Sequence, residues 1–138
     1  MSDLSLRPAV LVVEGLETTV RFGRRRIPVV KNVSFDVRRG ECLAIVGESG
    51  SGKSMTALSL IRLLPAAATI TAGSAHLKGR DLLRLREAEM RELRGAEIAM
   101  IYQDPTSSLD PLVTVGKQIA EAIEAHGAHG SRQAWRQA

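Results

Sequence analysis

The segment at residues 47–54 constrains the fold of this chain more than any other. It reads Gly-Glu-Ser-Gly-Ser-Gly-Lys-Ser and matches the pattern G-x-x-x-x-G-K-[ST]. Its three glycines allow the backbone to turn tightly and to aim successive N–H groups at one anion. A continuous apolar run at residues 42–46 precedes it, and a helix-like run follows it. This order of strand, glycine-rich loop and helix predicts a phosphate-binding loop.

Each position of this loop has a physical task. Lys53 supplies a mobile cation for the β- and γ-phosphates of a nucleotide, and Ser54 offers a hydroxyl to Mg²⁺. The helix that begins near Gly52 adds its dipole and its free N–H groups at the same point. A glycine-rich turn without a ligand is the alternative, and the flanking strand and helix argue against it. The predicted phosphate-binding residues are Gly47, Glu48, Ser49, Gly50, Ser51, Gly52, Lys53, Ser54 and Met55.

The N-terminal part of the chain has the pattern of an antiparallel sheet. Residues 9–13 and 17–22 are rich in β-branched side chains and are separated by Gly15. Residues 33–37 alternate apolar and polar side chains, as a half-buried strand does, and a turn follows at residues 38–41.

The remainder has the pattern of an α/β fold. Residues 42–46 are continuously apolar, and residues 97–102 are apolar after Glu97, which predicts two strands buried on both faces of a parallel sheet. A further strand is expected at residues 69–77. Helical spacing and helix-forming residues predict three helices, at residues 55–64, at 82–93 and from about Val113 onward.

Length and composition exclude several classes of protein. The 138 residues suffice for one domain, and no apolar run approaches the ~20 residues of a membrane-spanning helix. No basic, apolar leader of the signal-peptide type opens the chain, and the single Cys42 excludes an internal disulfide. These features predict a cytoplasmic protein.

The basic excess does not predict a nucleic-acid partner. Lys and Arg number 19 against 15 Asp and Glu, a net charge of +4. One arginine cluster lies at residues 21–26, and a second, at residues 80–94, alternates with acidic residues, as a solvated face does. With few aromatic residues, the chain also lacks a platform for base stacking.

A second candidate site follows the apolar run that ends at Tyr102. Asp104 could be the acid that holds Mg²⁺ in a complete small P-loop kinase or NTPase. Alternatively, Gln103 could contact Mg²⁺ or the attacking water, or Asp104 could simply organise a turn before Pro105. Spacing alone leaves these three interpretations open.

Three stretches together resemble one family. They are residues 47–54, residues 77–82 (Leu-Lys-Gly-Arg-Asp-Leu) and residues 98–111, which contain Gln-Asp-Pro-Thr-Ser-Ser-Leu-Asp-Pro. They resemble the ATP-binding subunit of ABC importers, specifically the dipeptide/oligopeptide branch. The resemblance runs from about residue 10 to residue 125, and residues 103–111 and 114–119 carry its branch-specific part.

The resemblance implies roles for particular residues. It makes Gln103 the Q-loop glutamine, which couples the nucleotide site to the membrane subunit, and it removes Asp104 as a metal ligand. Lys53 and Gln103 become the catalytic residues, Ser54 and Gln103 the metal ligands, and ATP and Mg²⁺ the cofactors. It also makes Phe22 the aromatic residue that stacks on adenine, with a place in the core of the sheet as the alternative.

The resemblance also implies partners and a location. The partners would be membrane-spanning permease subunits and a second ATP-binding subunit, in a homodimer or a heterodimer. The chain would then lie peripherally on the cytoplasmic face of a bacterial-type cell membrane.

Other motifs of the family are absent from residues 112–138: the Leu-Ser-Gly-Gly-Gln signature, the strand ending in Asp-Glu and the switch histidine. We therefore expect an incomplete, truncated ABC ATP-binding domain that does not hydrolyse ATP alone. Its expected parts are an antiparallel β part at residues 9–41, a P-loop to Q-loop core at 42–111 and the start of the helical subdomain at 112–138. The alternatives are a nucleotide-binding fragment without a transport role and the small kinase that uses Asp104.

The remaining chemically notable residues have ordinary interpretations. Cys42, in an apolar run, is expected to be an inert core thiol. His76 is expected at the surface of a strand. His126 and His129 are expected in a solvated tail rather than in a zinc site, which needs three or four ligands. Trp135 is expected to pack against a partner or an incomplete core.

Overall fold

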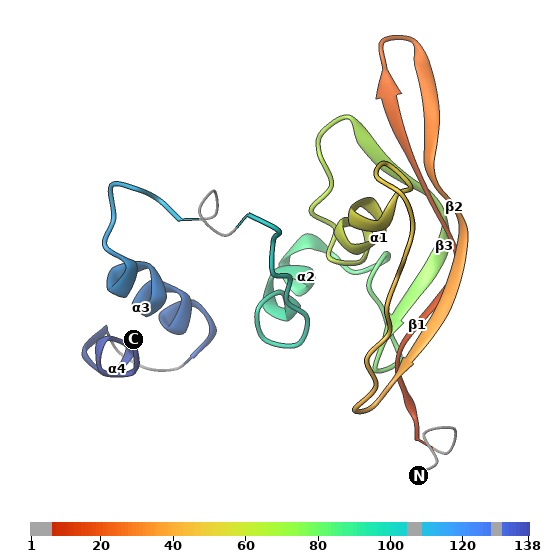
Figure 1. Cartoon of the computed structure of the whole chain (residues 1–138). Helices are drawn as coiled ribbons and strands as arrows, with labels where there is room; N and C mark the ends of the chain where they lie inside the picture. The colour runs from red at the N-terminus through yellow and green to blue at the C-terminus, as the bar shows by residue number, and fades with distance from the viewer. Residues whose placement is uncertain (1–6, 105–108, 128–130) are drawn as a thin grey trace. The chain divides into compact units, whose positions relative to one another are not determined.

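The computed structural model of the chain describes residues 7–104, 109–127 and 131–138 (Figure 1). It divides into two units, Met1–Met90 and Arg91–Ala138. The first unit holds β1 (Ala9–Phe22), β2 (Arg25–Arg38), α1 (Lys53–Leu60), β3 (Ala68–Leu77) and β4 (Arg80–Asp81). The second holds α3 (Val115–His126) and α4 (Ser131–Gln137), and α2 (Glu87–Leu93) crosses the boundary.

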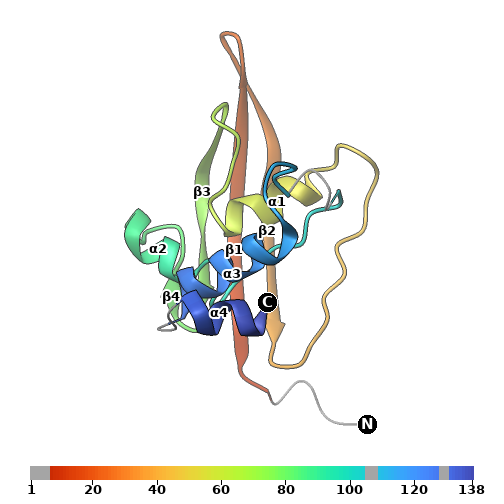
Figure 2. The same ribbon diagram turned by 90° about the vertical axis from the view of Figure 1, so that its left-hand side faces the viewer.

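The first unit is built on an antiparallel sheet with the strand order β2-β1-β3-β4. β1 and β2 form a long hairpin whose tip projects beyond α1 (Figures 1 and 2). The expected antiparallel sheet is therefore confirmed, with one difference: the two segments around Gly15 form one continuous strand. Gly15 has φ +56°, and the register of β1 with β2 shifts between Val13 and Leu16, so the glycine bends the strand without ending it.

The core of the first unit lies between the sheet and α1. Apolar side chains of β1, β2, α1 and β3 are buried there, among them Val13, Leu16, Val30, Leu60 and Ala75. Thr18 of β1 and Ser59 of α1 share a hydrogen bond of 2.8 Å inside this core. The face of β1 that carries Thr18 is therefore the face that α1 covers.

Helix α2 is shorter than the sequence predicts. Residues 82–86 do not form the first part of the helix: the Asp81 carboxylate accepts a hydrogen bond from the Leu83 N–H at 3.0 Å, and the Arg62 guanidinium donates to the Leu82 and Leu85 carbonyls. The helix begins at Glu87, and the Glu89 carboxylate caps it by accepting a bond from the Arg86 N–H at 2.8 Å.

The two segments predicted as buried parallel strands are not strands in this structure. Residues 42–46 have no regular structure and are exposed, including Cys42, and Val46 is 89% exposed. Within residues 97–102 only Ile98 makes a bridge, to Arg94. A strand buried on both faces needs a hydrogen-bonded neighbour on each side, and the described part of the chain supplies none to residues 42–46. The expectation of Cys42 as a core thiol is wrong for the same reason.

In the second unit, α3 begins at Val115, two residues after the predicted start, and Thr114 is its N-cap residue. The Gln118 side chain ties the preceding turn to the helix by bonds with the backbone of Asp110 and Val113. After His126 the sequence predicts a solvated tail, but Ser131–Gln137 form α4, and Trp135 lies against Gly116 of α3. His129 lies outside the described residues. No helix in the described ranges has the length and apolar character to cross a membrane.

Candidate functional site

The predicted phosphate-binding loop leads directly into α1 in the first unit. Gly50 and Gly52 both have positive φ, +80° and +96°, which other residues rarely adopt. The Ser51 N–H donates to the Glu48 carbonyl at 3.2 Å and closes the turn between them. The glycines thus occupy the two positions where this loop needs left-handed backbone.

Gly52 also fixes the loop against the sheet. A Cβ atom at this position would collide with the backbone carbonyl oxygen of Val29 in β2. The sequence pattern predicts a glycine here for its φ angle, but it gives no sign of this contact with a strand 23 residues earlier. Only glycine allows the loop to lie so close to β2.

Helix α1 presents its N-terminus to the same loop. Its first backbone bond runs from the Thr56 N–H to the Gly52 carbonyl at 2.8 Å, and the Thr56 hydroxyl donates to the same oxygen at 3.0 Å. The N–H groups of Lys53, Ser54 and Met55 precede this bond, where a helix has no carbonyl of its own to offer them. The first turn of α1 contains no acidic residue. This end of the helix therefore favours an anion.

The Lys53 side chain folds back over the loop. Its Nζ donates to the carbonyl oxygens of Gly47 and Glu48, each at 2.7 Å, and lies 3.4 Å from the Ser51 Oγ. The sequence predicts that this ammonium serves the phosphate site, and the structure holds it at the loop by carbonyl groups. A phosphate would compete for the same cation with a full negative charge, which is the stronger partner.

A cleft of about 340 Å³ lies beside the loop. Its walls come from Val33 and Phe35 of β2, from residues 43–46, and from the loop and the first turn of α1. A second cleft of about 420 Å³ joins residues 27–31 of β2 to Gly50, Ser51 and Thr56. The loop is therefore reached from open space on the α1 side of the sheet.

Phe22 lies at the end of β1 and is 78% exposed, so the alternative of a core position is wrong. Beyond Thr19 the hairpin register is regular, pairing Val20 with Ile27 and Phe22 with Arg25. Because side chains alternate along a strand, Phe22 shares the face of Thr18, the face that α1 covers. An exposed aromatic ring on this face is compatible with adenine stacking, which stays a prediction.

Gln103 and Asp104 belong to the second unit, and both are exposed. Residues 105–108 of the branch-specific stretch lie outside the described residues. The roles of Gln103 in coupling, in catalysis and as a metal ligand stay predictions.

The donors near α1 suit Mg²⁺ bound together with phosphate. Ser54 is exposed in the first turn of α1, where its hydroxyl is a hard oxygen ligand. Over residues 7–104, 109–127 and 131–138, no three His, Cys, Asp or Glu side chains gather closely enough to hold a metal ion. Mg²⁺ usually takes one or two protein ligands and completes its shell with phosphate and water, so a single hydroxyl fits this mode.

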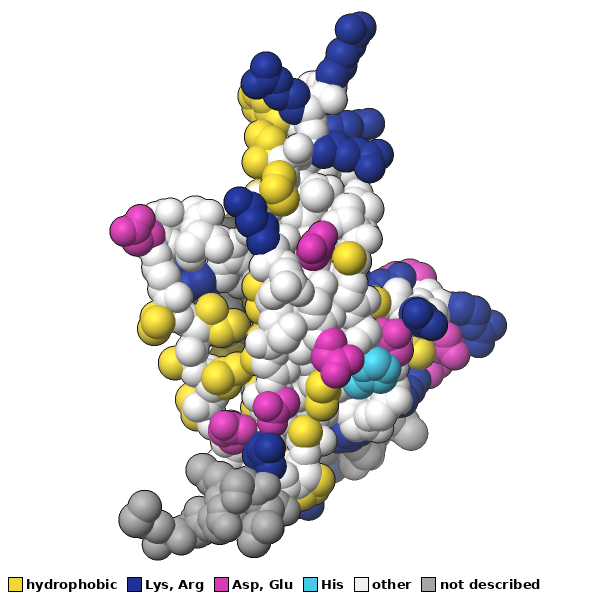
Figure 3. Space-filling model, turned by 90° about the vertical axis from the view of Figure 1, so that its right-hand side faces the viewer, with side chains coloured by type: hydrophobic (Ala, Val, Ile, Leu, Met, Phe, Trp, Pro, Cys, Tyr) yellow, Lys and Arg dark blue, Asp and Glu magenta, His cyan; other side chains and the backbone are white. Residues whose placement is uncertain are grey.

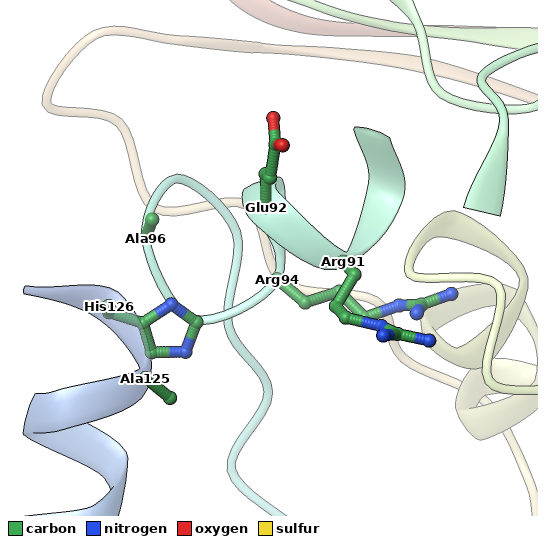
Figure 4. Close-up of a pocket in the computed structure, with 6 residues that line it drawn as sticks. All are labelled: Arg91, Glu92, Arg94, Ala96, Ala125 and His126. Atoms are coloured by element: carbon green, nitrogen blue, oxygen red, sulfur yellow. The ribbon is translucent and has the colours of Figure 1, made fainter. Parts of the chain in front are cut away.

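A further cleft, of about 570 Å³, lies within the second unit (Figure 4). Its lining residues are Arg91, Glu92, Arg94, Ala96, Ala125 and His126. His126 is the last residue of α3 and is exposed, and its ring lies where a Cβ atom of Gly95 would stand. The guanidinium groups of Arg91 and Arg94 point away from His126 (Figure 4). These polar groups do not converge on one point, and the cleft is not a candidate for a charged ligand.

A glycine-rich loop, a helix N-terminus and a lysine directed to one point define a P-loop nucleotide-binding protein. A family model described as ABC transporter matches residues 30–138 of this chain. The chain therefore belongs to the ABC transporter family.

Two curated relatives are similar to this chain over most of its length. The chain is 52% identical over 120 residues to the probable peptide ABC transporter ATP-binding protein y4tR of Sinorhizobium fredii, covering 86% of this chain and 36% of that protein. It is 49% identical over 123 residues to the glutathione import ATP-binding protein GsiA of Escherichia coli strain K12, covering 85% of this chain and 20% of that protein. The chain thus spans about a third and a fifth of the length of these relatives.

Solved structures agree on the fold. The chain matches the dimeric ATP-binding cassette MJ0796 bound to ADP and Pi with a TM-score of 0.77 at 24% identity, over 92% of this chain and 53% of that one. A second dimeric structure of MJ0796, a bacterial ABC transporter cassette, matches with the same TM-score at 23% identity. The fold class is therefore the ABC ATPase cassette, of which the described residues form an α/β part with an antiparallel sheet.

Proposed function

We propose that this chain binds ATP as the ATP-binding component of an ABC importer for peptides or similar small solutes. The observation that carries the proposal is the loop at residues 47–54, with Gly50 and Gly52 at positive φ and the Lys53 ammonium held over it. The names of the relatives support the import of a peptide: one is a probable peptide transporter protein and the other imports glutathione.

In this proposal the phosphates of ATP lie at the N-terminus of α1. The N–H groups of Lys53, Ser54 and Met55 donate to phosphate oxygens, and the Lys53 ammonium leaves the carbonyls of Gly47 and Glu48 to pair with them. The Ser54 hydroxyl is the protein ligand of Mg²⁺ nearest to these phosphates. When bound, Mg²⁺ neutralises charge that develops on the phosphoryl group.

Phe22 holds the adenine ring in the same proposal. It lies at the end of β1, on the face covered by α1, and most of its surface is open. Stacking of a base on an aromatic ring contributes about 1–3 kcal/mol. This contact distinguishes ATP from a bare triphosphate.

Gln103 has the role of the coupling glutamine between the nucleotide site and the permease subunits. The partners proposed are these membrane-spanning subunits and a second ATP-binding subunit, and MJ0796 supports the second by its dimeric structure. The chain then works peripherally, at the cytoplasmic face of the membrane. The proposed layout keeps residues 9–41, 42–111 and 112–138 as its three parts.

Uptake of a labelled dipeptide tests the transport role. A strain that lacks the gene for the ATP-binding subunit that contains these residues should take up the dipeptide only when that gene is restored. A gene that carries Lys53→Ala should fail to restore uptake. One that carries Lys117→Ala should succeed, because Lys117 is exposed on α3, where its Nζ lies 3.8 Å from a carboxylate oxygen of Glu121. Full uptake with Lys53→Ala would refute the proposal.

A further inference from the structure

A polar cleft lies at the tip of the β1–β2 hairpin. It has a volume of about 190 Å³ and is lined by Thr19, Arg21, Arg26, Ala66, Ala67 and Thr69. Water occupies roughly 30 Å³ per molecule in the liquid, so the cleft has room for a small oxyanion and part of its hydration shell.

The register of the sheet brings the polar side chains of this cleft to one face. Thr19 of β1 is paired with Thr69 of β3, and Arg21 of β1 is paired with Arg26 of β2. Thr19 and Arg21 are two residues apart, so they lie on the same face of β1. These two threonines and two arginines are therefore neighbours on one face of the sheet, and all four line the cleft.

This face is opposite to the phosphate-binding loop. Thr18, the neighbour of Thr19, points toward α1, where its hydroxyl bonds to Ser59. Thr19 and Arg21 consequently point to the other side of the sheet. The hairpin cleft and the loop before α1 are two separate places on the first unit.

The backbone fixes the wall of the cleft. The Arg21 N–H donates to the Ala67 carbonyl at 2.8 Å, and the Ala68 N–H donates to the Pro65 carbonyl at 2.8 Å. The turn at residues 65–68 is thus tied both to itself and to β1. Ala66 and Ala67 hold their positions beside the arginines without any side chain that could fill the space.

Four arginines gather at the hairpin tip: Arg21, Arg24, Arg25 and Arg26. Arg21 and Arg26 stand directly opposite each other across the ladder, and Arg24 and Arg25 follow in the same hairpin. Dark blue side chains gather at the hairpin tip in Figure 3. Within the described residues, none of these four arginines forms an ion pair. Like charges directly opposite each other in a sheet are destabilising, and an anion between them reverses the sign of the interaction.

We propose that the cleft at the hairpin tip binds a phosphate group, held by Arg21 and Arg26 and by the hydroxyls of Thr19 and Thr69. Guanidinium groups match the oxygens of phosphate with paired donors, and each hydroxyl adds one donor. The phosphate can be free in solution or part of a lipid headgroup, since the same chemistry recognises both. The proposal is independent of nucleotide binding at the loop.

Nuclear magnetic resonance of the ¹⁵N-labelled 138-residue chain tests the proposal with inorganic phosphate as the first probe. The amide signals of Thr19, Arg21, Ala67 and Thr69 should shift together and saturate, apart from any change at residues 50–55. The second probe is a vesicle of phosphatidylcholine with phosphatidylglycerol, compared with phosphatidylcholine alone. Saturation by inorganic phosphate supports a soluble ligand, and response only to the phosphatidylglycerol vesicle supports a lipid headgroup.

Arginine variants supply a control matched in charge. Arg21→Gln and Arg26→Gln should each weaken binding of the responding probe about tenfold, while Arg24→Gln, which removes the same charge outside the cleft, should weaken it less than threefold. Equal losses in all three variants would show that net charge acts without a built site and would overturn the proposal. The absence of shifts in the cleft of the unaltered chain with both probes would overturn it without any variant.

Discussion

The hydroxyl groups of Thr18 and Ser59 are joined by a hydrogen bond of 2.8 Å in the core between β1 and α1. Both residues are fully buried. The Ser59 hydroxyl donates its proton to the Met55 carbonyl at 2.6 Å, so Thr18 is the donor to Ser59. This bond holds α1 against the sheet. It thereby also holds the N-terminus of α1, which directly follows the phosphate-binding loop.

Replacement of Thr18 by valine should destabilise the first unit. Valine keeps the shape of threonine but removes the donor, so the free energy of unfolding should fall by about 1–2 kcal/mol in urea titrations followed by circular dichroism. Thr71→Val, at an exposed position of β3, is the matched control and should change stability by less than about 0.5 kcal/mol. If both variants were equally stable, the buried bond would not hold α1 in place.

Replacement of Gly52 by alanine should damage both stability and nucleotide binding. The residue has φ +96°, and the added methyl group meets the Val29 carbonyl, so the loop must move away from β2. We expect a loss of more than about 2 kcal/mol and no detectable binding of ATP. Gly23→Ala, with φ +60° and open space around it, should cost only about 1 kcal/mol and leave binding unchanged. Normal ATP binding by Gly52→Ala would contradict the contact with β2.

Phe22→Ala should show how much of the affinity for ATP comes from the adenine base rather than from the phosphates. Loss of stacking should weaken ATP binding by roughly 5- to 150-fold and leave the affinity for inorganic triphosphate unchanged, as measured by calorimetry. Phe22→Tyr keeps an aromatic ring and should retain most of the affinity for ATP. A parallel loss for both ligands in Phe22→Ala would place the effect in the fold of the hairpin rather than in the contact with adenine.

The pKa of the Glu89 carboxyl should depend on its hydrogen bonds with Arg86 at the start of α2. A side-chain hydrogen bond from Arg86, with a second from the Arg86 backbone N–H, lowers the pKa of the Glu89 carboxyl. A carboxyl group with a lowered pKa stabilises the folded state above its unfolded pKa, and that contribution is lost as pH falls through the folded pKa. In Arg86→Ala the pKa of Glu89 should rise toward its ordinary value, as ¹³C resonances of the carboxyl would record. Arg91→Ala should leave it unchanged; an unshifted titration in Arg86→Ala would exclude Arg86 as the cause.

Local patterns predicted much of the first unit. The spacing of glycine, lysine and serine in residues 47–54 located the loop, because each residue type there serves a local requirement of backbone angle or charge. Alternation along residues 9–37 predicted the antiparallel sheet for a similar reason. The structure added the contact of Gly52 with Val29 and the pairing of Arg21 with Arg26. The second follows from a two-residue turn at Gly23 and Arg24, which the arginine cluster alone does not reveal.

The segments that the sequence pattern predicted wrongly depend on hydrogen bonds with other parts of the chain. Residues 42–46 have the apolar character of a buried strand, but a strand forms only where neighbours satisfy its N–H and C=O groups. Cys42 is exposed along with them. Helix α2 starts later than predicted because two groups that a helix over residues 82–86 would pair have other partners: the Leu82 carbonyl accepts a bond from the Arg62 guanidinium, and the Arg86 N–H donates to the Glu89 carboxylate. In each case an interaction outside the periodic pattern decided the structure.

The affinity of the chain for ATP with and without Lys53 tests the central claim most directly. Calorimetry with ATP and Mg²⁺ should detect binding by the unaltered chain, and Lys53→Ala should lower the affinity at least tenfold, because the cation held over the loop is gone. Lys117→Ala, which removes an equal charge from the surface of α3, should bind as the unaltered chain does. Tight binding of ATP that does not depend on Lys53 would contradict the assignment of residues 47–54 as the nucleotide site.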